Sequence, residues 1–170
     1  MTNFSELPLS AQLKSNLAKN NFTEPTPVQS LAIEPALEGK DVVATAQTGT
    51  GKTLAFLLPT IQLLSTEARQ PGVRALILTP TRELALQINE ALLLIGRGTG
   101  IRSAVAVGGL NERTQLRDIR AGAQVVVATP GRLYDFMSRG LINLTNVRIL
   151  ILDESDRMLD MGFLPTIKRI

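Results

Sequence analysis

The sequence of 170 residues contains no cysteine and no histidine. Without cysteine, disulfide bonds, thiolate nucleophiles and zinc–cysteine sites are excluded. Without histidine, Ser-His triads, histidine-bound metals and imidazole acid–base chemistry are excluded as well. Any chemistry must therefore come from Asp, Glu, Lys, Arg, Ser or Thr side chains, from backbone amides or from a bound metal.

Aromatic residues and long apolar runs are also scarce. Aromatic residues make up 4% of the chain against 44% hydrophobic residues, a balance that favours an aliphatic α/β core. The longest apolar stretch, near 54–64, is too short to cross a bilayer and contains Pro59 and Gln62. No charged-then-apolar leader opens the chain. We therefore expect a soluble, cytoplasmic protein with no membrane partner. Its net charge is only +3, carried by 13 Arg and 5 Lys against 15 acids.

Apolar runs alternate with helical patterns along the chain. Strands are expected at 41–45, 74–79, 102–107, 124–129 and 148–152, and helices at 9–19, 82–96, 111–121 and 130–139, with 111–121 exposed. This alternation predicts a mostly parallel sheet joined by crossover helices. In such sheets, ligands bind at the carboxyl ends of the strands.

A glycine-bearing loop follows the first expected strand and opens into a helix. It consists of Ala46, Gln47, Thr48, Gly49, Thr50, Gly51, Lys52 and Thr53. The glycines let backbone N–H groups turn toward an anion, and the helix adds its own unpaired N–H groups. Lys52 can reach the β- and γ-phosphates of a nucleotide, and the Thr53 hydroxyl can bind magnesium. The pattern is the phosphate loop GxxxxGK[ST] with Ala46 in place of the first glycine; the alternative is a plain strand-to-helix turn.

An acidic cluster follows the last expected strand. Asp153, Glu154, Ser155 and Asp156 come directly after it. Asp153 suits a hydrated magnesium ion, partly through water, and Glu154 suits the orientation of an attacking water. The alternative is that these acids only cap a helix. We therefore expect Lys52, Asp153 and Glu154 to be the catalytic residues and Thr53 and Asp153 the metal ligands.

Three further loops follow expected strands and offer backbone N–H groups at helix starts or glycine turns. They contain Pro80, Thr81, Arg82 and Glu83; Gly108 and Gly109; and Thr129, Pro130, Gly131 and Arg132. This chemistry suits a sugar-phosphate backbone bound without base readout. Each loop alone is also an ordinary helix start.

In these motifs the chain resembles the first RecA-like domain of a DEAD-box ATP-dependent RNA helicase, a P-loop NTPase fold with three α/β/α layers. Residues 21–29 match the adenine-sensing Q motif of that family, with Asn21 in place of glycine; Asn tolerates a left-handed backbone. By resemblance, Gln29 binds the adenine edge, Phe22 packs beside the base, and Thr26 and the isolated aromatic Phe4 belong to the same site.

The resemblance also assigns the remaining motifs. Residues 46–53 correspond to motif I, in which alanine is normal at the first position, and the three further loops correspond to RNA-backbone contacts. The signature tetrapeptide is matched except for Ser155, where alanine is expected, and Asp156 communicates with a Ser-Ala-Thr motif that residues 1–170 do not contain.

The resemblance implies ATP and magnesium as cofactors and RNA as a partner. It implies ATP hydrolysis coupled to local duplex unwinding or remodelling of RNA–protein complexes. Residues 1–40 are expected to form the N-terminal helix and Q motif, and residues 41–170 an incomplete ATP-binding core, truncated before the Ser-Ala-Thr strand. The second RecA-like domain is a further partner. The isolated fragment is expected to be inactive, and either partly rearranged or self-associated through unpaired strand edges. Two alternatives remain: a nucleotide-gated RNA clamp, and another P-loop ATPase without helicase activity.

Ser155 generates a prediction about the signature tetrapeptide. Serine is small and can bond to nearby backbone, so it should be tolerated at this strand-to-helix corner. We expect Ser155→Ala to change the steady-state ATPase turnover of the full-length enzyme by less than about tenfold. A larger change would show that the hydroxyl acts in the catalytic cycle.

Overall fold

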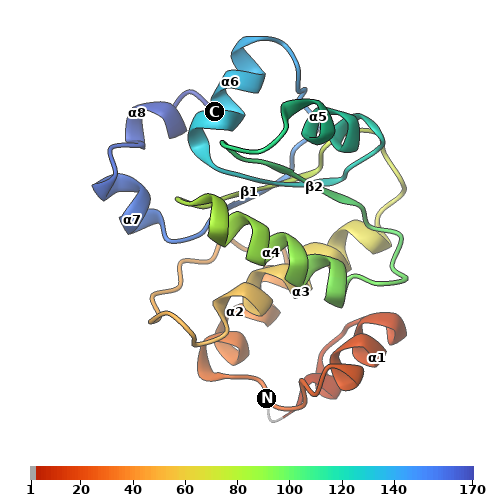
Figure 1. Ribbon diagram of the computed structural model, residues 1–170. Helices are drawn as coiled ribbons and strands as arrows, with labels where there is room; N and C mark the ends of the chain where they lie inside the picture. The colour runs from red at the N-terminus through yellow and green to blue at the C-terminus, as the bar shows by residue number, and fades with distance from the viewer. Residues whose placement is uncertain (1–2) are drawn as a thin grey trace. The chain divides into compact units, whose positions relative to one another are not determined.

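A four-stranded parallel sheet organises the strands of the computed structural model, which describes residues 3–170 (Figure 1). The strands are β1 (Ala75–Leu78), β2 (Ser103–Ala106), β3 (Val125–Ala128) and β4 (Ile149–Leu152), in the order β2-β3-β1-β4. All pairings are parallel. The prediction of an α/β chain with parallel strands is confirmed, as are the last four of the expected strands.

The register of the sheet brings the four strands to an end at one level. Leu78 at the end of β1 lies opposite Ala128 on one side and Leu152 on the other, and Ala106 lies opposite Ala128. The residue that follows each strand therefore leaves the sheet beside the residue that follows its neighbour. This register is what lines up the loops at the carboxyl edge.

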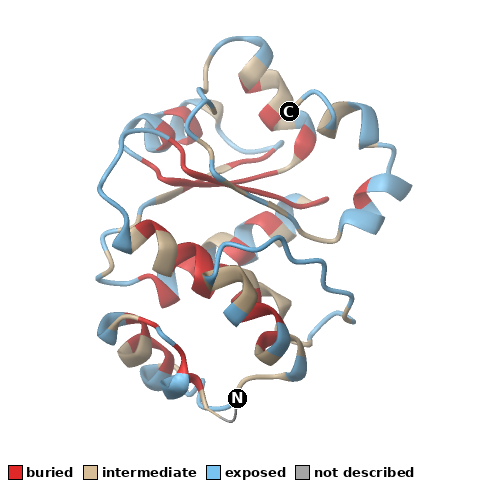
Figure 2. Cartoon of the chain, turned by 180° about the vertical axis from the view of Figure 1, so that it is seen from behind, coloured by how far each residue is buried: buried red, intermediate tan, exposed pale blue. Residues whose placement is uncertain are grey.

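The described chain forms two compact units, and the sheet belongs to the second, residues 70–90 and 102–170. This unit also contains α5 (Glu112–Arg120), α6 (Pro130–Ser138), α7 (Ser155–Asp160) and α8 (Leu164–Ile167). Its apolar core joins strand residues such as Leu78 and Val126 to Leu133, Phe136 and Met158 from the helices. Figure 2 shows the buried strands in red. Parallel strands buried in this way read as continuous apolar runs, which is why the sequence reveals them.

The first unit is helical and consists of residues 3–69 and 91–101. It contains the 3₁₀ helix η1 (Phe4–Glu6) and the α-helices α1 (Ala11–Lys19), α2 (Pro27–Leu37) and α3 (Lys52–Thr66), and α2 packs on α3. Helix α4 (Arg82–Ile95) has residues in both units. The Asn16 side chain of α1 donates hydrogen bonds to the carbonyls of Ile95 (2.6 Å) and Arg97 (2.7 Å), which ties α1 to the end of α4. The expected division of the chain at residue 40 stays a prediction.

Local sequence signals explain where the helices begin. The Ser10 hydroxyl accepts a hydrogen bond from the Leu13 N–H at the start of α1, and the Asn111 side chain accepts one from Thr114 at the start of α5. Pro27 and Pro130 open α2 and α6, at a position where their missing N–H is not needed. The expected helices are confirmed, except that α5 is not exposed throughout: Gln115, Leu116 and Ile119 are buried.

The strand expected at 41–45 does not form, and that prediction was wrong. Residues 41–46 have no regular structure, and Val43 is 98% exposed. A strand is stable only when a neighbouring strand pairs with its N–H and C=O groups, and within residues 3–170 no strand pairs with this segment. The apolar run at 41–45 therefore has the sequence of a strand, but no strand pairs with it within residues 3–170.

Strand β4 forms as expected but is not buried as its apolar sequence suggested. Its residues alternate between partly buried and exposed, and Leu150 is 57% exposed. Among the described residues β4 pairs only with β1, so it is an edge strand of the sheet. Within the same residues, every helix is too short or too polar to span a bilayer.

Candidate phosphate-binding and strand-end sites

The carboxyl edge of the sheet collects four of the sequence motifs in one row. In sheet order, Gly108-Gly109 lies beyond β2, residues 129–132 beyond β3, residues 80–83 beyond β1, and residues 153–156 beyond β4. Three hydrogen bonds extend the ladder by one step, from Thr129 N–H to the Ala106 carbonyl (3.1 Å), from Thr79 N–H to the Ala128 carbonyl (3.0 Å) and from Asp153 N–H to the Leu78 carbonyl (2.9 Å). The predicted loops are thus neighbours in space as well as similar in chemistry.

The glycine-bearing loop lies in the first unit, directly before α3. Gly49 and Gly51 have φ values of 83° and 89°, in the left-handed region that favours glycine. The Lys52 ammonium donates a hydrogen bond to the Ala46 carbonyl (2.7 Å), and the Thr50 hydroxyl donates one to the Gln47 carbonyl (2.7 Å). Lys52 and Thr53 are the first residues of the 15-residue helix α3, whose first N–H groups have no partner within the helix.

This arrangement fits a phosphate ligand on chemical grounds. Gln47, Thr48 and Gly49 are exposed, so the loop is open to solvent. Three kinds of donor suit a polyphosphate here. They are the backbone N–H groups at the start of α3, the Lys52 ammonium and the Thr53 hydroxyl. The strand that was expected to precede the loop is absent, and the loop follows a segment without regular structure.

The Q-motif residues Thr26 and Gln29 contact the loop directly. Gln29 is 3% exposed; its Oε1 accepts from the Thr26 N–H (2.9 Å) and its Nε2 donates to the Gly51 carbonyl (3.0 Å). The Thr26 hydroxyl is buried and has no hydrogen-bond partner among the described residues. One N–H of the Gln29 amide and one lone pair of its oxygen remain available. The side chain thus links the start of α2 to the phosphate loop.

The two aromatic residues expected beside a base occupy different environments. Phe22 is 36% exposed, whereas Phe4 is buried and its N–H donates to the Thr23 carbonyl (3.1 Å). Phe4 therefore anchors η1 to the Q-motif segment. Asn21 has φ 60°, which confirms the left-handed backbone expected at this position.

Beyond β1, Arg82 reaches toward the glycine pair beyond β2. A Cβ built on Gly109, whose φ is 78°, would lie 2.7 Å from Arg82 Nη1, so a side chain at this position would displace the guanidinium. The Thr81 hydroxyl accepts from Leu84 N–H (3.3 Å) at the start of α4, and Arg82 also contacts the Glu83 carboxylate (3.2 Å). The Glu83 pKa is lowered by its own backbone N–H and by Arg82.

Beyond β3, Arg132 is held between a ring and a carboxylate. Its guanidinium lies over Phe136 at 5.4 Å from the ring centroid and 4.0 Å from Glu112 of α5, and its side chain is only 18% exposed. Its Nη1 atom is buried and makes no hydrogen bond within the described part of the chain. Arg132 therefore keeps an unused donor close to the carboxyl edge.

Glu112 is the centre of an ion-pair network between α5 and α6. Both of its carboxylate oxygens accept from Arg139 (2.8 and 3.0 Å), and Arg139 also binds Asp135 (2.9 Å). Arg139 lowers the pKa of Glu112, and Glu112 together with Asp135 raises the pKa of Arg139. A bidentate arginine–carboxylate pair fixes direction as well as distance, so α5 and α6 are joined at this edge.

Beyond β4, Glu154 is the residue with the unusual backbone. Its φ of 50° and ψ of 48° lie in the left-handed region, which a non-glycine residue enters rarely and often at functional sites. Its carboxylate lies 3.3 Å from Arg157 one turn along α7. Asp153 is partly buried, while Ser155 and Asp156 are exposed.

The structure joins some predicted residues and leaves others in separate units. Thr26 and Gln29 meet the phosphate loop in the first unit, and Arg82 meets Gly109 in the second. Lys52 and Thr53 belong to the first unit and Asp153 and Glu154 to the second, so a shared site remains a prediction. Among residues 3–170, no group of three acids is placed to bind a metal by itself. Magnesium is usually held by one or two carboxylates together with phosphates and water.

Three residues that sequence reasoning missed support the strand-end loops. Gln115 accepts from the Val107 N–H (3.1 Å) and donates to the Val107 carbonyl (3.0 Å), which fixes α5 to the segment entering Gly108-Gly109. Glu112 and Phe136 hold Arg132. The Gln115–Val107 contact spans 8 positions and the Glu112–Arg132 contact joins two different helices, so neither leaves a periodic signal in the sequence. Arg132 and Phe136 lie at i,i+4 spacing in α6, which could have revealed this pair.

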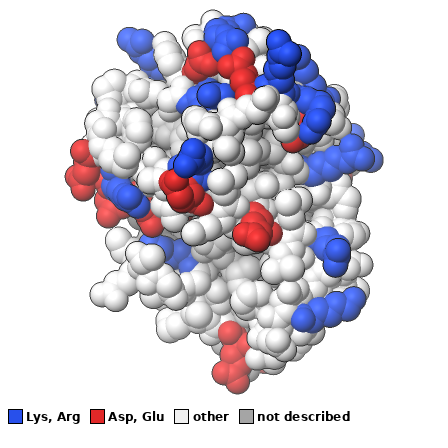
Figure 3. Space-filling model, viewed as in Figure 1, with Lys and Arg blue, Asp and Glu red and all other residues white. Residues whose placement is uncertain are grey.

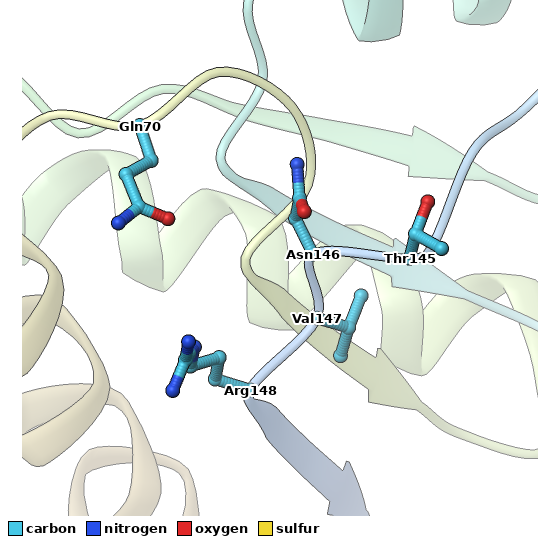
Figure 4. A pocket seen from close by; sticks show the side chains of 5 residues that line it. All are labelled: Gln70, Thr145, Asn146, Val147 and Arg148. Atoms are coloured by element: carbon cyan, nitrogen blue, oxygen red, sulfur yellow. The ribbon is translucent and has the colours of Figure 1, made fainter.

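A cavity of about 410 Å³ lies before the start of β4, at the end of the sheet opposite the strand-end loops (Figure 4). It is lined by Gln70, Thr145, Asn146, Val147 and Arg148, none of which was a predicted site residue. These residues precede β1 and β4, so the cavity is at the amino end of the strands, opposite the motif loops. In parallel α/β sheets the carboxyl edge is the usual ligand site, and we place the function there.

Comparison with known proteins supports the interpretation of the motifs. A family model described as DEAD/DEAH box helicase matches residues 26–170. The DEAD-box ATP-dependent RNA helicase CshA of Streptococcus pneumoniae is 47% identical over 167 residues, which cover 98% of this chain and 32% of that protein. The ATP-dependent RNA helicase RhlB of Pasteurella multocida is 44% identical over 170 residues, covering 97% of this chain and 40% of that protein.

A solved structure shows the same fold. The crystal structure of a DEAD box protein from the hyperthermophile Methanococcus jannaschii matches with a TM-score of 0.91 and 38% sequence identity, over 99% of this chain and 46% of that chain. The prediction of a RecA-like α/β fold is thereby confirmed. The chain spans about a third of the length of CshA, at 32%, and a similar share of RhlB, at 40%.

The contact between Gln29 and the loop predicts unequal effects of two glycine substitutions. A Cβ on Gly51 would lie 2.4 Å from Gln29 Nε2 and 3.1 Å from Thr26 Oγ1, whereas a Cβ on Gly49 would meet nothing within 4 Å. Both positions have positive φ, so Gly49→Ala measures the backbone strain alone. We expect Gly51→Ala to lower the free energy of unfolding by about 1–3 kcal/mol more than Gly49→Ala in urea denaturation.

A double-mutant cycle tests the cause of this difference. In a Gln29→Ala background the steric conflict is removed, so the extra cost of Gly51→Ala should shrink. Equal losses for Gly49→Ala and Gly51→Ala, or an extra cost that persists without the Gln29 side chain, would contradict the contact.

The lowered pKa of Glu112 predicts a pH-dependent contribution to stability. A carboxylate whose folded pKa lies below its ordinary value of 4.5 stabilises the fold above the unfolded pKa. That contribution is lost as the pH falls through the folded pKa. Glu112→Gln should therefore lower the melting temperature at pH 7, and the difference from wild type should diminish below about pH 4.5. Glu90→Gln, at an exposed position of α4, is the control and should show no such trend. A difference that stays constant with pH would mean that the ion pairs with Arg139 and Arg132 contribute nothing.

Proposed function

Because this chain belongs to the DEAD/DEAH box helicase family, we propose that it is the ATP-binding and RNA-contacting domain of an ATP-dependent RNA helicase. The enzyme couples ATP hydrolysis to local unwinding of RNA duplexes or remodelling of RNA–protein complexes. A second RecA-like domain in the full-length protein completes the site, and the isolated domain has negligible activity. Association of isolated domains through the β4 edge is part of the same proposal.

The phosphate loop is the observation that carries this proposal. Gly49 and Gly51 take positive φ at the start of α3, and the Lys52 ammonium folds over the loop to the Ala46 carbonyl. The backbone N–H groups of residues 46–53 surround the phosphates, and Lys52 exchanges the carbonyl for phosphate oxygens. Thr53 binds the magnesium ion that accompanies the nucleotide.

The Q-motif residues recognise the adenine of ATP. Gln29 has one amide N–H and one lone pair left after its bonds to Thr26 and Gly51. These groups match the donor–acceptor edge of adenine. Phe22, which is partly exposed, packs beside the base, and Phe4 supports the segment from behind. Because Gln29 touches both base and loop, base binding is communicated to the phosphate site.

The acids beyond β4 act on the water and the metal. Bound ATP and magnesium supply the phosphoanhydride bond and the charge neutralisation that hydrolysis requires. Asp153 holds the metal partly through water, and Glu154 orients the attacking water, with Arg157 fixing its carboxylate from one side (3.3 Å). Asp156, which is exposed, couples the site to the second domain.

The loops beyond β2, β3 and β1 bind the RNA backbone. Arg82 and Arg132 supply guanidinium groups, and the glycine turns and helix starts supply N–H groups. The buried Nη1 of Arg132, which has no hydrogen bond within residues 3–170, is suited to a phosphate oxygen. These groups contact phosphate oxygens and not base edges, so binding is independent of base sequence.

Two other functions compete with this proposal. A P-loop ATPase acting on DNA or protein would share the phosphate loop but would not need the Q motif or the strand-end loops. A nucleotide-gated RNA clamp would bind ATP and RNA but would not need hydrolysis. The intact Lys52 and Glu154 favour the helicase.

One set of measurements on the full-length protein separates these functions. We expect its ATPase to be stimulated by single-stranded RNA and not by DNA of the same sequence. We expect Glu154→Gln to lower turnover by roughly 10²-fold or more, with ATP binding retained, because the water loses its orienting group. Asp160→Asn, an exposed position on the same helix, is the control. Equal stimulation by DNA would reject RNA specificity, and an ATPase turnover that Glu154→Gln leaves unchanged would favour a clamp.

A further inference from the structure

Helix α5 presents a stripe of three exposed arginines, Arg113, Arg117 and Arg120. Their spacing of four and three residues places them along one side of the helix. The opposite side is buried through Gln115, Leu116 and Ile119. We call these three residues the arginine stripe.

The surroundings of the stripe are strongly basic. Residues 102–139 contain six Arg, no Lys and three acids, a net charge of +3 that equals the net charge of the whole chain. All three acids are engaged: Glu112 and Asp135 with Arg139, and Asp118 with Arg117. Within residues 3–170, neither Arg113 nor Arg120 makes an ion pair. Figure 3 shows Lys and Arg side chains gathered over α5, in the upper right of the view.

The helix dipole does not account for the stripe. Arg117 and Arg120 lie in the last turn of α5, where positive charge is favoured. Arg113 is the second residue of the helix, where the dipole is positive and a cation is unfavourable. An anion at this end would therefore be attracted by both the helix start and Arg113.

Hydrogen bonds fix the position of the arginine stripe relative to the Gly108-Gly109 loop. Gln115 binds both the N–H and the C=O of Val107, and Asn111 caps the first turn of α5. At the far end, Arg102 Nη1 donates to the Ala121 carbonyl (3.0 Å) and adds a further guanidinium. With a rise of about 1.5 Å per residue, the stripe extends roughly 10 Å away from the loop.

We propose that the arginine stripe of α5 binds the RNA backbone beyond the strand-end loops, where the RNA leaves the Gly108-Gly109 loop. This inference rests on the proposed function, and it extends the RNA-binding surface to a helix that the motifs do not include. Arginine offers a planar fork of donors that matches phosphate oxygens. Guanidinium–phosphate contacts are electrostatic and do not read base edges, so binding by the stripe is independent of base sequence.

The test compares RNA lengths in the full-length protein. The variant carries Arg113→Gln, Arg117→Gln and Arg120→Gln, and affinity is measured for oligouridines of about 8 and about 30 nucleotides, the shorter being within a single binding-site length. Affinity for the longer RNA should fall roughly 10²-fold near 0.1 M salt, and the slope of log K against log[salt] should weaken by about 2, or 0.7 per lost contact. Affinity for the shorter RNA should not change. Arg97→Gln, an exposed arginine in the first unit, should leave both affinities unchanged.

Each other outcome has a definite meaning. If wild type binds both RNAs and the triple variant binds the longer one equally well, the inference fails and the proposed function stands. If wild type binds neither RNA, the proposed function fails and the inference with it. An equal loss of affinity for both RNA lengths would assign the stripe to the core RNA site and overturn the inference. The inference would also be overturned if the variant lost binding to polyglutamate, used as a probe for an acidic protein partner, but kept its affinity for RNA. Should the triple variant not fold, single Arg113→Gln and Arg120→Gln variants test the same length dependence, each with a slope change of about 0.7.

Discussion

The parallel pairing of β1 with β3 and β4 is the constraint on which the functional edge depends. Its register sets Leu78 opposite both Ala128 and Leu152, so the chain leaves three neighbouring strands at one level. Parallel strands need a crossover after each strand, and each crossover must begin with a loop at the same edge. The chemistry of this unit follows from that geometry, because every strand delivers its next residues to the same row.

Gln115 and Glu112 fix the row of loops at the carboxyl edge, although neither binds a ligand in the proposed function. Gln115 holds the loop beyond β2, and Glu112 joins Arg139 and Arg132 across α5 and α6. Gln29 plays the corresponding part in the first unit, where its buried amide ties α2 to Gly51. Preorganised donors lose less conformational entropy when an anion binds. In both units a buried side-chain amide thus forms hydrogen bonds to a glycine-containing loop or to the residue that enters it.

Much of the fold and site could be predicted because the signals are local. The apolar runs of β1, β3 and β4 and the left-handed backbone of Asn21 were predicted correctly. The prediction failed for 41–45, since a strand needs a partner and no sequence window contains one. It also failed for the buried side of α5 and for the exposure of Leu150, because burial depends on which elements pack nearby. The predicted roles of the site residues stay predictions.

By itself the sequence determined the family, the order of the motifs and the residue types available for chemistry, because these depend only on identity and spacing along the chain. Only the tertiary structure decided which side chains meet: Gln29 with Gly51, Arg82 with Gly109, and Glu112 with Arg139. These contacts join residues separated by turns, strands and helices, and their distances depend on strand register and helix packing. Arg82 and Gly109 lie 27 positions apart along the chain, and only the packing of the loops beyond β1 and β2 brings the guanidinium against the glycine.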